Sequence, residues 1–331
     1  MCDSDPSAEE SHVATGTRRQ FISGFGAALG AASLGRSVAA GQEEARDLGP
    51  DRLVLLGTRG GPLITGYTPT PSANLIVFDG IPLVVDTGYG VTLKLLDAHI
   101  ALQRLRYIFI THHHSDHNLE LGPLLYNAWA SGLSTPVDVY GPHGLSALLG
   151  YYWKSNGFDM ETRISDEGRP DLRRLVRPHE FTEGRVMSFD SVKVSSLRNH
   201  HPPVIESYAL KFELGNKTVV FSGDTTFFPP LVEFAKGADY LVHEVTYGPA
   251  LDAMVARRPN AARLKASILS HHTTAEDVGR IATLAQVKAL VLNHFVPGDD
   301  PSLTPEVWAD AVRTTFKGKI IVGRDMLTLA L

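Results

Sequence analysis

The sequence is almost free of cysteine. Among its 331 residues it contains one, Cys2. A single cysteine excludes disulfide bonds within the chain and metal sites built from several thiolates. It also limits the groups available for nucleophilic catalysis, so that chemistry at a site has to depend on histidine, carboxylate and hydroxyl side chains.

The sequence also lacks an excess of positive charge. The formal net charge is −5, and 20% of the residues are charged. Proteins that bind nucleic-acid phosphates usually carry a basic surface, and this chain shows neither a long Lys/Arg block nor an RNA-binding motif. We therefore predict no nucleic-acid partner. The hydrophobic content of 43% is that of an ordinary globular protein able to bury a sizeable core.

A long apolar run is missing as well, so we predict no membrane span. The first forty residues differ from the rest: paired arginines, Arg18 and Arg19, precede a short Gly/Ala-rich apolar stretch that ends in small residues at Ala40. This pattern is typical of a twin-arginine export signal. We expect residues 1–40 to be that signal, removed together with Cys2, and the mature protein to be periplasmic. The alternative is an N-terminal tail without a targeting role.

The remaining chain, residues 41–331, is rich in predicted strands. Short apolar runs such as "RLVLLGT", "IPLVVDTG", "KTVVFSGD" and "KALVLNHF" end at Gly, Asp or His, as strands with tight turns do. Helical spacing occurs between them, for example in "HGLSALLGYYWKS". Residues 159–180 predict a loop or lid, and "KIIVGRD" with "LTLAL" predicts a closing strand pair. Two β-rich halves flanked by helices indicate one layered domain.

The stretch "FITHHHSDHN" places several metal-binding side chains at the end of a predicted strand. Side chains at i and i+2 of an extended segment point the same way, so His112 and His114 should converge. Asp116 and His117 follow a turn and can address a neighbouring point. Imidazole and carboxylate groups at this spacing suit Zn²⁺ or a similar cation. His113 should point away.

Three further strand ends carry potential ligands. They are His201 after "SVKVSSLRN", with His200 as the competing neighbour, Asp224 in "VVFSGD", and His294 in "LVLNHF". A polar residue that closes a buried run is costly unless it is paired or ligated. Repetition at independent strand ends therefore indicates a metal site.

With these residues in order, the chain resembles the metallo-β-lactamase fold. The signature H-x-H-x-D-H runs from His112 to His117. The resemblance implies an α+β fold, the αββα sandwich, in which two packed mixed β-sheets are flanked by helices. It also implies one or two Zn²⁺ ions per chain, with a first metal on His112, His114 and His201, a second on Asp116, His117 and His294, and Asp224 between them.

Within that family, "SGDT", "LVHEVTY", "HTTAEDVGRIA" and "LNHF" look most like the branch that holds ribonuclease Z and aryl sulfatases. The resemblance implies catalytic roles for Asp116 and Asp224 as ligands that accept a proton, and for His272 with Glu244 as its orienting partner. The long basic arm of tRNA-processing relatives has no evident counterpart, and export would separate the enzyme from tRNA.

The whole chain is also similar to zinc-dependent hydrolytic dehalogenases. This resemblance implies an enzyme that replaces a ring chlorine of chlorothalonil, a chlorinated aromatic nitrile, by hydroxide from metal-bound water. The alternative is an exported aryl sulfatase, esterase, lactonase or phosphodiesterase of the same fold. A small aromatic substrate would need aromatic walls, for which Tyr126, Trp129 and Trp153 are candidates, although each could equally belong to the core. The aromatic patch on "LLGYYWKSNGF" predicts a homodimer.

Overall fold

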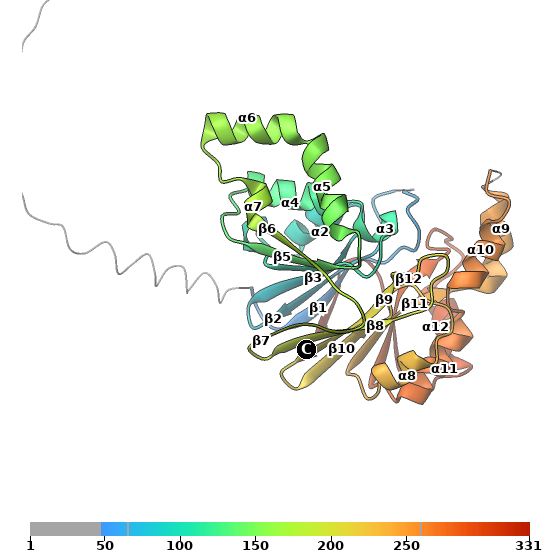
Figure 1. Cartoon of the computed structure of the whole chain (residues 1–331). Coiled ribbons are helices and arrows are strands. Elements are labelled where there is room, and N and C mark those ends of the chain that lie inside the picture. Colours follow the sequence, from blue (N-terminus) through green and yellow to red (C-terminus); the bar gives the residue numbers. More distant parts are fainter. Residues whose placement is uncertain (1–47, 65, 259) are drawn as a thin grey trace, which may run out of the picture. The chain divides into compact units, whose positions relative to one another are not determined.

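The strands form two seven-stranded sheets in a computed structural model of the chain (Figure 1). The structure describes residues 48–64, 66–258 and 260–331, so the export signal predicted at residues 1–40 lies outside it. In spatial order, the first sheet contains β14 (Leu327–Ala330), β1 (Arg52–Gly57), β2 (Ala73–Phe78), β3 (Ile81–Thr87), β4 (Tyr107–Phe109), β5 (Val137–Gly141) and β6 (Val176–Glu180). The second contains β13 (Lys319–Val322), β12 (Ala289–Val296), β11 (Tyr240–Thr246), β10 (Lys217–Phe221), β9 (Tyr208–Leu214), β8 (Val192–Arg198) and β7 (Gly184–Phe189).

Each sheet has an antiparallel part and a parallel part. In the first sheet, β14, β1, β2 and β3 pair antiparallel, and β3 to β6 pair parallel. In the second, β7 to β10 pair antiparallel, and β10 to β13 pair parallel. Both sheets are therefore mixed.

Helices cover the outer face of each sheet (Figure 1). The helical elements are α2 (Val91–Asp97), η2 (Leu102–Arg104), α3 (Ser115–Asn118), α4 (Leu121–Ala130), α5 (Leu145–Ser155), α6 (Gly157–Glu167), α7 (Leu172–Leu175), α8 (Pro230–Phe234), η3 (Gly248–Ala250), α9 (Leu251–Ala256), α10 (Leu264–His271), α11 (Ala275–Ala285) and α12 (Pro305–Arg313). None of the helices in the described ranges is long and apolar enough to cross a membrane.

The core explains why β1 is apolar at successive positions. Leu53 and Leu55 join an apolar cluster that also contains Phe212 and Val291 from the second sheet. The intervening Val54 and Leu56 join a different cluster, with residues of α2, α4 and α5. Since side chains alternate along a strand, a sheet covered on both faces needs apolar residues throughout. The predicted sandwich of two mixed sheets flanked by helices is confirmed.

Two local predictions are wrong. The charged segment 159–180 is not a loop, because it contains most of α6, all of α7 and β6. The last two strands do not pair with each other: β13 pairs with β12, whereas β14 pairs with β1 in the other sheet. The last two strands thus belong to different sheets, and the segment between them connects the two sheets.

Candidate metal centre

The histidine and aspartate side chains meet where strands of both sheets end. His112 and His114 follow β4, and α3 begins directly after them. His201 lies beyond β8, Asp224 lies beyond β10, and His294 lies within β12. The ends of parallel strands are the usual place for a site in such sheets because loops from several strands converge there.

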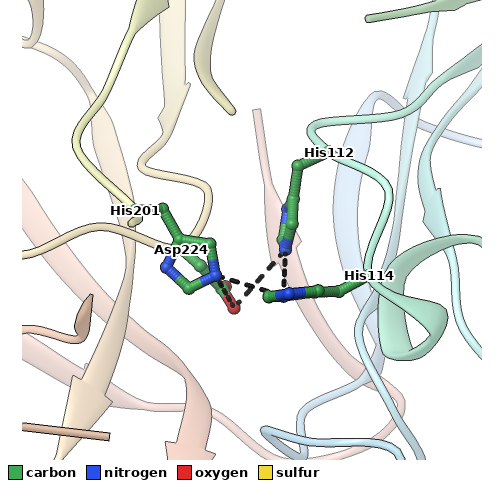
Figure 2. A group of neighbouring side chains, drawn as sticks. All are labelled: His112, His114, His201 and Asp224. Carbon is green, nitrogen blue, oxygen red and sulfur yellow. Dashed lines mark hydrogen bonds and ion pairs between the residues drawn. The ribbon is translucent and has the colours of Figure 1, made fainter. Parts of the chain in front are cut away.

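One group consists of His112, His114, His201 and Asp224, whose side chains point toward one another (Figure 2). Nδ1 of His114 lies 3.1 Å from Nε2 of His112 and 3.1 Å from Nε2 of His201. Oδ2 of Asp224 lies 3.8 Å from Nε2 of His112 and 3.9 Å from Nε2 of His201. Three imidazoles and a carboxylate at this spacing form a donor set suited to Zn²⁺.

A second group, Asp116, His117, Asp224 and His294, is buried beside the first. Nε2 of His294 lies 3.2 Å from Oδ2 of Asp116 and 3.2 Å from Oδ2 of Asp224. Nε2 of His117 lies 3.3 Å from Oδ1 of Asp224. Asp224 belongs to both groups, so its carboxylate can bridge two cations.

A local irregularity of β12 aims His294 at the site. Glu244 of β11 pairs with Asn293 and Val245 pairs with Phe295, so His294 is the extra residue of a bulge. Its φ is +44°. Bulges redirect side chains and are frequent next to active sites. Gly60 lies against this ring, because a Cβ built there would be 2.9 Å from Nδ1 of His294.

Several ligand candidates are oriented by a hydrogen bond from the ring nitrogen that faces away from the site. Nδ1 of His117 lies 2.8 Å from Oδ2 of Asp86. Nδ1 of His201 lies 2.9 Å from the carbonyl oxygen of His271. If these Nδ1 atoms carry the protons, each Nε2 presents a lone pair to the site, and such outer hydrogen bonds are typical of metal-binding histidines.

The protonation states largely agree with those that metal ligands need. Burial lowers the pKa of His201 to about 4 and that of His112 well below 6.5. Burial alone would raise the pKa of Asp224, but His294 and His117 hold it well below 3.8. Neutral imidazoles and ionised carboxylates result, and both bind metal ions. His117 is the exception: burial lowers its pKa, but Asp224 and Asp86 raise it well above 6.5.

The buried polar atoms of the second group show that a cation fits. Within the described ranges, Nε2 of His117 and Oδ1 of Asp224 are buried and form no hydrogen bond of good geometry; they only face each other at 3.3 Å. Buried polar atoms are rarely left unsatisfied. A metal ion bound by both atoms would satisfy them. Its positive charge would take the place of the proton that the surrounding carboxylates otherwise stabilise on His117.

His272 and Glu244 form a buried pair next to the two groups. Nδ1 of His272 lies 2.6 Å from Oε2 of Glu244, whose Oε1 accepts a hydrogen bond from the backbone N–H of Thr225 at 2.6 Å. Burial lowers the pKa of His272, but Glu244 outweighs it and raises this pKa to about 9. The predicted pairing of these two residues is therefore present in the structure.

A cavity of about 750 Å³ opens over the site. His114, Asp116, Asp224, His272 and His294 contribute to its lining. The rest of the lining comes mainly from the segment after β1, from α9 and the residues after it, from α10, and from the end of β12 with the segment that follows. Its volume lies within the usual range for small-ligand pockets, roughly 300–1,000 Å³.

The structure does not bring the predicted substrate contacts to this cavity. Trp129 is 1% exposed and belongs to the core under the first sheet, and Trp153 packs against the same core. The hydroxyl of Tyr126 bonds to Asp159 of α6. None of the three lines the cavity, so the expectation of aromatic substrate walls is corrected: these rings hold α4, α5 and α6 together.

Two neighbouring histidines lie outside both ligand groups. Nδ1 of His113 lies 3.1 Å from Nδ2 of Asn118, and its Nε2 lies 3.4 Å from the carbonyl oxygen of Pro142. His200 is exposed and lies 3.0 Å from the hydroxyl oxygen of Thr226. The structure thus brings His201, and not His200, to the site.

Sequence reasoning missed Asp86 and the arginines that line the cavity. Asp86 ends an apolar strand in "VVDTG", the same signal that singled out Asp224, and could have been found by it. Arg59 and Arg258 carry no such signal, because only the folded chain shows that both line the same cavity as the ligand candidates.

Comparisons with known proteins agree with this fold and site. Residues 52–256 match the family described as "Anti-Pycsar protein Apyc1". A ribonuclease Z of Mycobacterium sp. (strain KMS) is 31% identical over 278 residues, which cover 83% of this chain and 94% of the relative. A ribonuclease Z of Mycobacterium bovis is 29% identical over 277 residues, with 83% and 96% covered.

Solved structures show the same fold. The metallo-β-lactamase fold protein YhfI of Bacillus subtilis superposes with a TM-score of 0.64 at 20% identity, over 85% of this chain and 99% of that one. The short form of human tRNase Z superposes with a TM-score of 0.61 at 21% identity, over 84% and 98%.

Fold and site together define a metal-dependent hydrolase of the metallo-β-lactamase fold. The relative at 31% identity shows more: the chain belongs to a ribonuclease Z-like family of these hydrolases. By its family match the chain also belongs to the family described as Anti-Pycsar protein Apyc1.

The relatives contradict the predicted dehalogenase. Their names are those of ribonucleases, which cleave phosphodiester bonds, so the prediction of a carbon–halide hydrolase acting on chlorothalonil is wrong. They also conflict with the predicted small aromatic substrate and with the exclusion of nucleic acid. The prediction of a metal-dependent hydrolase is confirmed, whereas zinc as the metal, export to the periplasm and the homodimer stay predictions.

Proposed function

We propose that this protein is a metal-dependent hydrolase of phosphodiester bonds in RNA. The observation that carries the proposal is the pair of ligand groups that share Asp224. Two adjacent cation sites are the arrangement with which many phosphodiesterases and nucleases clamp a phosphoryl group. The names of the curated relatives, ribonuclease Z, support RNA as the substrate.

The residues of the two groups would hold the metal ions. One ion would lie among His112, His114 and His201, the other among Asp116, His117 and His294, and Asp224 would contact both. We propose Zn²⁺, because imidazole nitrogens and carboxylate oxygens are its usual ligands in proteins without thiolates. When bound, such ions supply Lewis-acid polarisation of the phosphoryl oxygens and make water nucleophilic at neutral pH.

His272 is placed to move a proton. Its Nδ1 is engaged by Glu244, and the residue lines the cavity beside Asp224 and His294. The proton on its Nε2 can therefore pass to the oxygen that leaves when the P–O bond breaks. Glu244 keeps the ring oriented and stabilises its positive charge, as a carboxylate does in other acid–base pairs. Either Asp116 or Asp224 can accept the proton of the attacking water.

The cavity limits the form of RNA that can react. A volume of about 750 Å³ accommodates a strand end but not a duplex. Apolar side chains of Leu63, Met254 and Ile268 line it and can cover the faces of unstacked bases, the form in which single-stranded RNA is usually bound. We therefore propose that a single-stranded segment enters the site while any helical part stays outside.

Hydrolysis assays test this proposal. The protein is stripped of metal, reloaded with Zn²⁺ or Mn²⁺, and incubated with bis(p-nitrophenyl) phosphate and with an RNA hairpin that carries a single-stranded 3′ extension. We expect cleavage of both, lost on chelation and restored by metal. If the reloaded protein cleaves neither substrate, or cleaves bis(p-nitrophenyl) phosphate but not the RNA, the proposal is overturned.

Two variants test the assigned roles. Asp224→Asn should abolish turnover and reduce the bound metal. His272→Gln should keep the bound metal and lower kcat by roughly 10²–10⁴, the usual contribution of a general acid. Asp310→Asn on the exposed face of α12 is the matched control and should keep both activity and metal.

A further inference from the structure

His271, the last residue of α10, has a ring nitrogen that the two ligand groups do not use. Its Nδ1 is buried and forms no hydrogen bond of good geometry within the described ranges. Its Nε2 lies 2.7 Å from the hydroxyl oxygen of Ser267, one helical turn earlier. Both residues line the same cavity as the metal ligands. Since buried polar atoms are rarely left without a partner, Nδ1 of His271 marks a place for a ligand.

His271 lies close to two histidines that already have a role at the site. One ring nitrogen each of His201, His271 and His272 lie within 4.8 Å of one another. The ring centroids of His271 and His272 are 5.2 Å apart, and each is also 5.2 Å from that of His201. Because His201 belongs to the first ligand group, this cluster adjoins the position of the first cation.

In each of the three rings, one nitrogen is held by an oxygen atom. Nδ1 of His201 lies 2.9 Å from the carbonyl oxygen of His271, and Nδ1 of His272 lies 2.6 Å from Oε2 of Glu244. The hydroxyl of Ser267 holds Nε2 of His271 in the same way. If the held nitrogens carry the protons, the other nitrogen of each ring presents a lone pair. This combination is typical of metal-binding histidines.

Only two of these rings are available to a further cation, because His201 serves the first group. His271 and His272 would be its protein ligands, and water or substrate would complete its coordination. Two protein ligands are fewer than the three or four of catalytic and structural zinc sites, so the ion would be held weakly. The carboxylate of Glu244, bonded to His272, favours a positive charge at this place.

We propose that His271 and His272 bind an additional, inhibitory Zn²⁺ ion in the cavity. This inference rests on the proposed function, in which the proton on Nε2 of His272 passes to the leaving oxygen. A Zn²⁺ ion on that nitrogen takes the place of the proton, so the enzyme loses its proton donor. Zinc in excess of the two ligand groups therefore inhibits the enzyme that bound zinc activates.

Equilibrium dialysis against increasing Zn²⁺, followed by elemental analysis, measures the additional ion. We expect the unsubstituted protein to bind one weakly held Zn²⁺ per chain more than His271→Asn. The tightly bound metal should be equal in both, because asparagine keeps the backbone carbonyl that orients His201. His143→Asn is the matched control. The side chain of His143 is 86% exposed and pairs with Glu180, outside the ligand groups, so this variant should keep the weakly held ion.

Hydrolysis of bis(p-nitrophenyl) phosphate by the metal-loaded protein provides a second measurement. We expect added Zn²⁺ to inhibit the unsubstituted protein and His143→Asn alike. His271→Asn should need at least about tenfold more Zn²⁺ for half-inhibition, the smaller of the usual effects of losing even an outer partner of a ligand. The rate of each protein is compared with its own maximum. Mg²⁺ at the same concentrations should not inhibit, because it prefers oxygen ligands to imidazole.

The outcomes separate the inference from the proposed function. Equal weak binding in the unsubstituted protein and His271→Asn, loss of the weak ion in His143→Asn, or loss of tightly bound metal in His271→Asn would overturn the additional site. Weak binding without inhibition, or equal inhibition by Mg²⁺, would overturn its inhibitory role. If the loaded protein hydrolyses neither bis(p-nitrophenyl) phosphate nor the RNA hairpin at any Zn²⁺ concentration, the proposed function fails, and dialysis alone decides whether the additional site exists.

Discussion

Asp86 and His117 form a buried pair, with Oδ2 of Asp86 2.8 Å from Nδ1 of His117. Their side chains are 4% and 2% exposed. The backbone N–H of Thr111 donates to the other carboxylate oxygen at 2.8 Å, so the carboxylate cannot turn freely. Asp86 therefore stabilises a proton on Nδ1 of His117 and orients Nε2 toward Asp116 and Asp224.

We expect Asp86→Asn to weaken metal binding by about tenfold to a hundredfold, the usual effect of losing such an outer partner. An amide is a weaker acceptor than a carboxylate and no longer enforces this tautomer. Competition with a chromophoric chelator measures the affinity, and urea unfolding checks that the variant is folded.

Asp138→Asn is the matched control for that substitution. Oδ1 of Asp138 on β5 lies 2.7 Å from Nε2 of His179, but this pair is partly exposed and lies outside the ligand groups. It should leave metal affinity unchanged. Equal affinity in the Asp86 and Asp138 variants would show that Asp86 does not orient a ligand.

Gly60 should be intolerant of a side chain. A Cβ at this position would lie 2.9 Å from Cε1 of His294 and 2.5 Å from Cγ2 of Val296. Since a buried core cannot absorb such overlaps without a shift, we expect Gly60→Ala to displace His294 and to reduce the metal bound per chain. Elemental analysis of the purified variant measures this.

Gly150→Ala provides the comparison for Gly60→Ala. Gly150 lies in α5, and a Cβ there meets no other heavy atom within 4 Å among the described residues. The substitution should keep the metal content and raise stability slightly, because alanine favours helix over glycine by about 1 kcal/mol. Full metal content in Gly60→Ala would contradict the role of the close approach.

Local patterns predicted the ligands because each one closes an apolar run. His112, Asp224 and His294 all follow or interrupt buried strands, and a polar group there must find a partner. Whether an aromatic residue faces a cavity depends instead on how its helix is rotated. Trp129 lies near the histidine motif in the sequence, yet α4 turns it into the core.

In the fold, too, some features follow from local sequence patterns and others only from the packing of the whole chain. Segment 159–180 lacks an apolar stripe, but Arg163 of α6 pairs with both Asp159 and Glu167 at helical i,i+4 spacing, which supports a helix without a large buried face. The pairing of Arg52 with Ala330, at opposite ends of the described chain, is set by the packing of the whole sandwich. No local sequence pattern predicts this pairing.

Stability of the metal-free protein should fall as the pH decreases below 6.5. Burial lowers the pKa of His201 from 6.5 to about 4. Between pH 6.5 and pH 4, this imidazole is therefore protonated in the unfolded chain and neutral in the folded chain. The loss from this residue is on the order of 3 kcal/mol across that window. The raised pKa of His117 adds no slope there, because both states are protonated.

Urea unfolding of chelator-treated protein at pH 7 and pH 5 measures this loss. His201→Gln removes the titrating ring, so its unfolding free energy should change less between the two pH values than that of the unsubstituted protein. An equal change in both proteins would contradict the assignment to His201.

The export prediction can be tested independently of the structure. Replacement of Arg18 and Arg19 by lysine keeps the charge but removes the paired arginines that the twin-arginine route requires. We expect the unsubstituted protein in the periplasmic fraction of a bacterial host and the variant in the cytoplasmic fraction. Equal distribution of the two would contradict the presence of a twin-arginine signal.

Asp325, in the segment between β13 and β14, binds residues that follow β1 and should be important for stability. Its Oδ1 accepts hydrogen bonds from the N–H and hydroxyl of Thr58 at 3.1 and 2.9 Å, and its Oδ2 accepts those of Thr70 at 2.9 and 3.0 Å. Lys94 adds an ion pair at 3.2 Å to this carboxylate, which is 6% exposed.

Removal of this carboxylate leaves four donors and a partly buried ammonium group without their partner. We expect Asp325→Ala to lower the free energy of unfolding by about 3–5 kcal/mol, the usual effect of breaking a buried charged network. Asp310→Ala removes an exposed carboxylate of α12 and should change it by less than about 0.5 kcal/mol. Urea unfolding compares the two variants, and similar values would refute the role of Asp325.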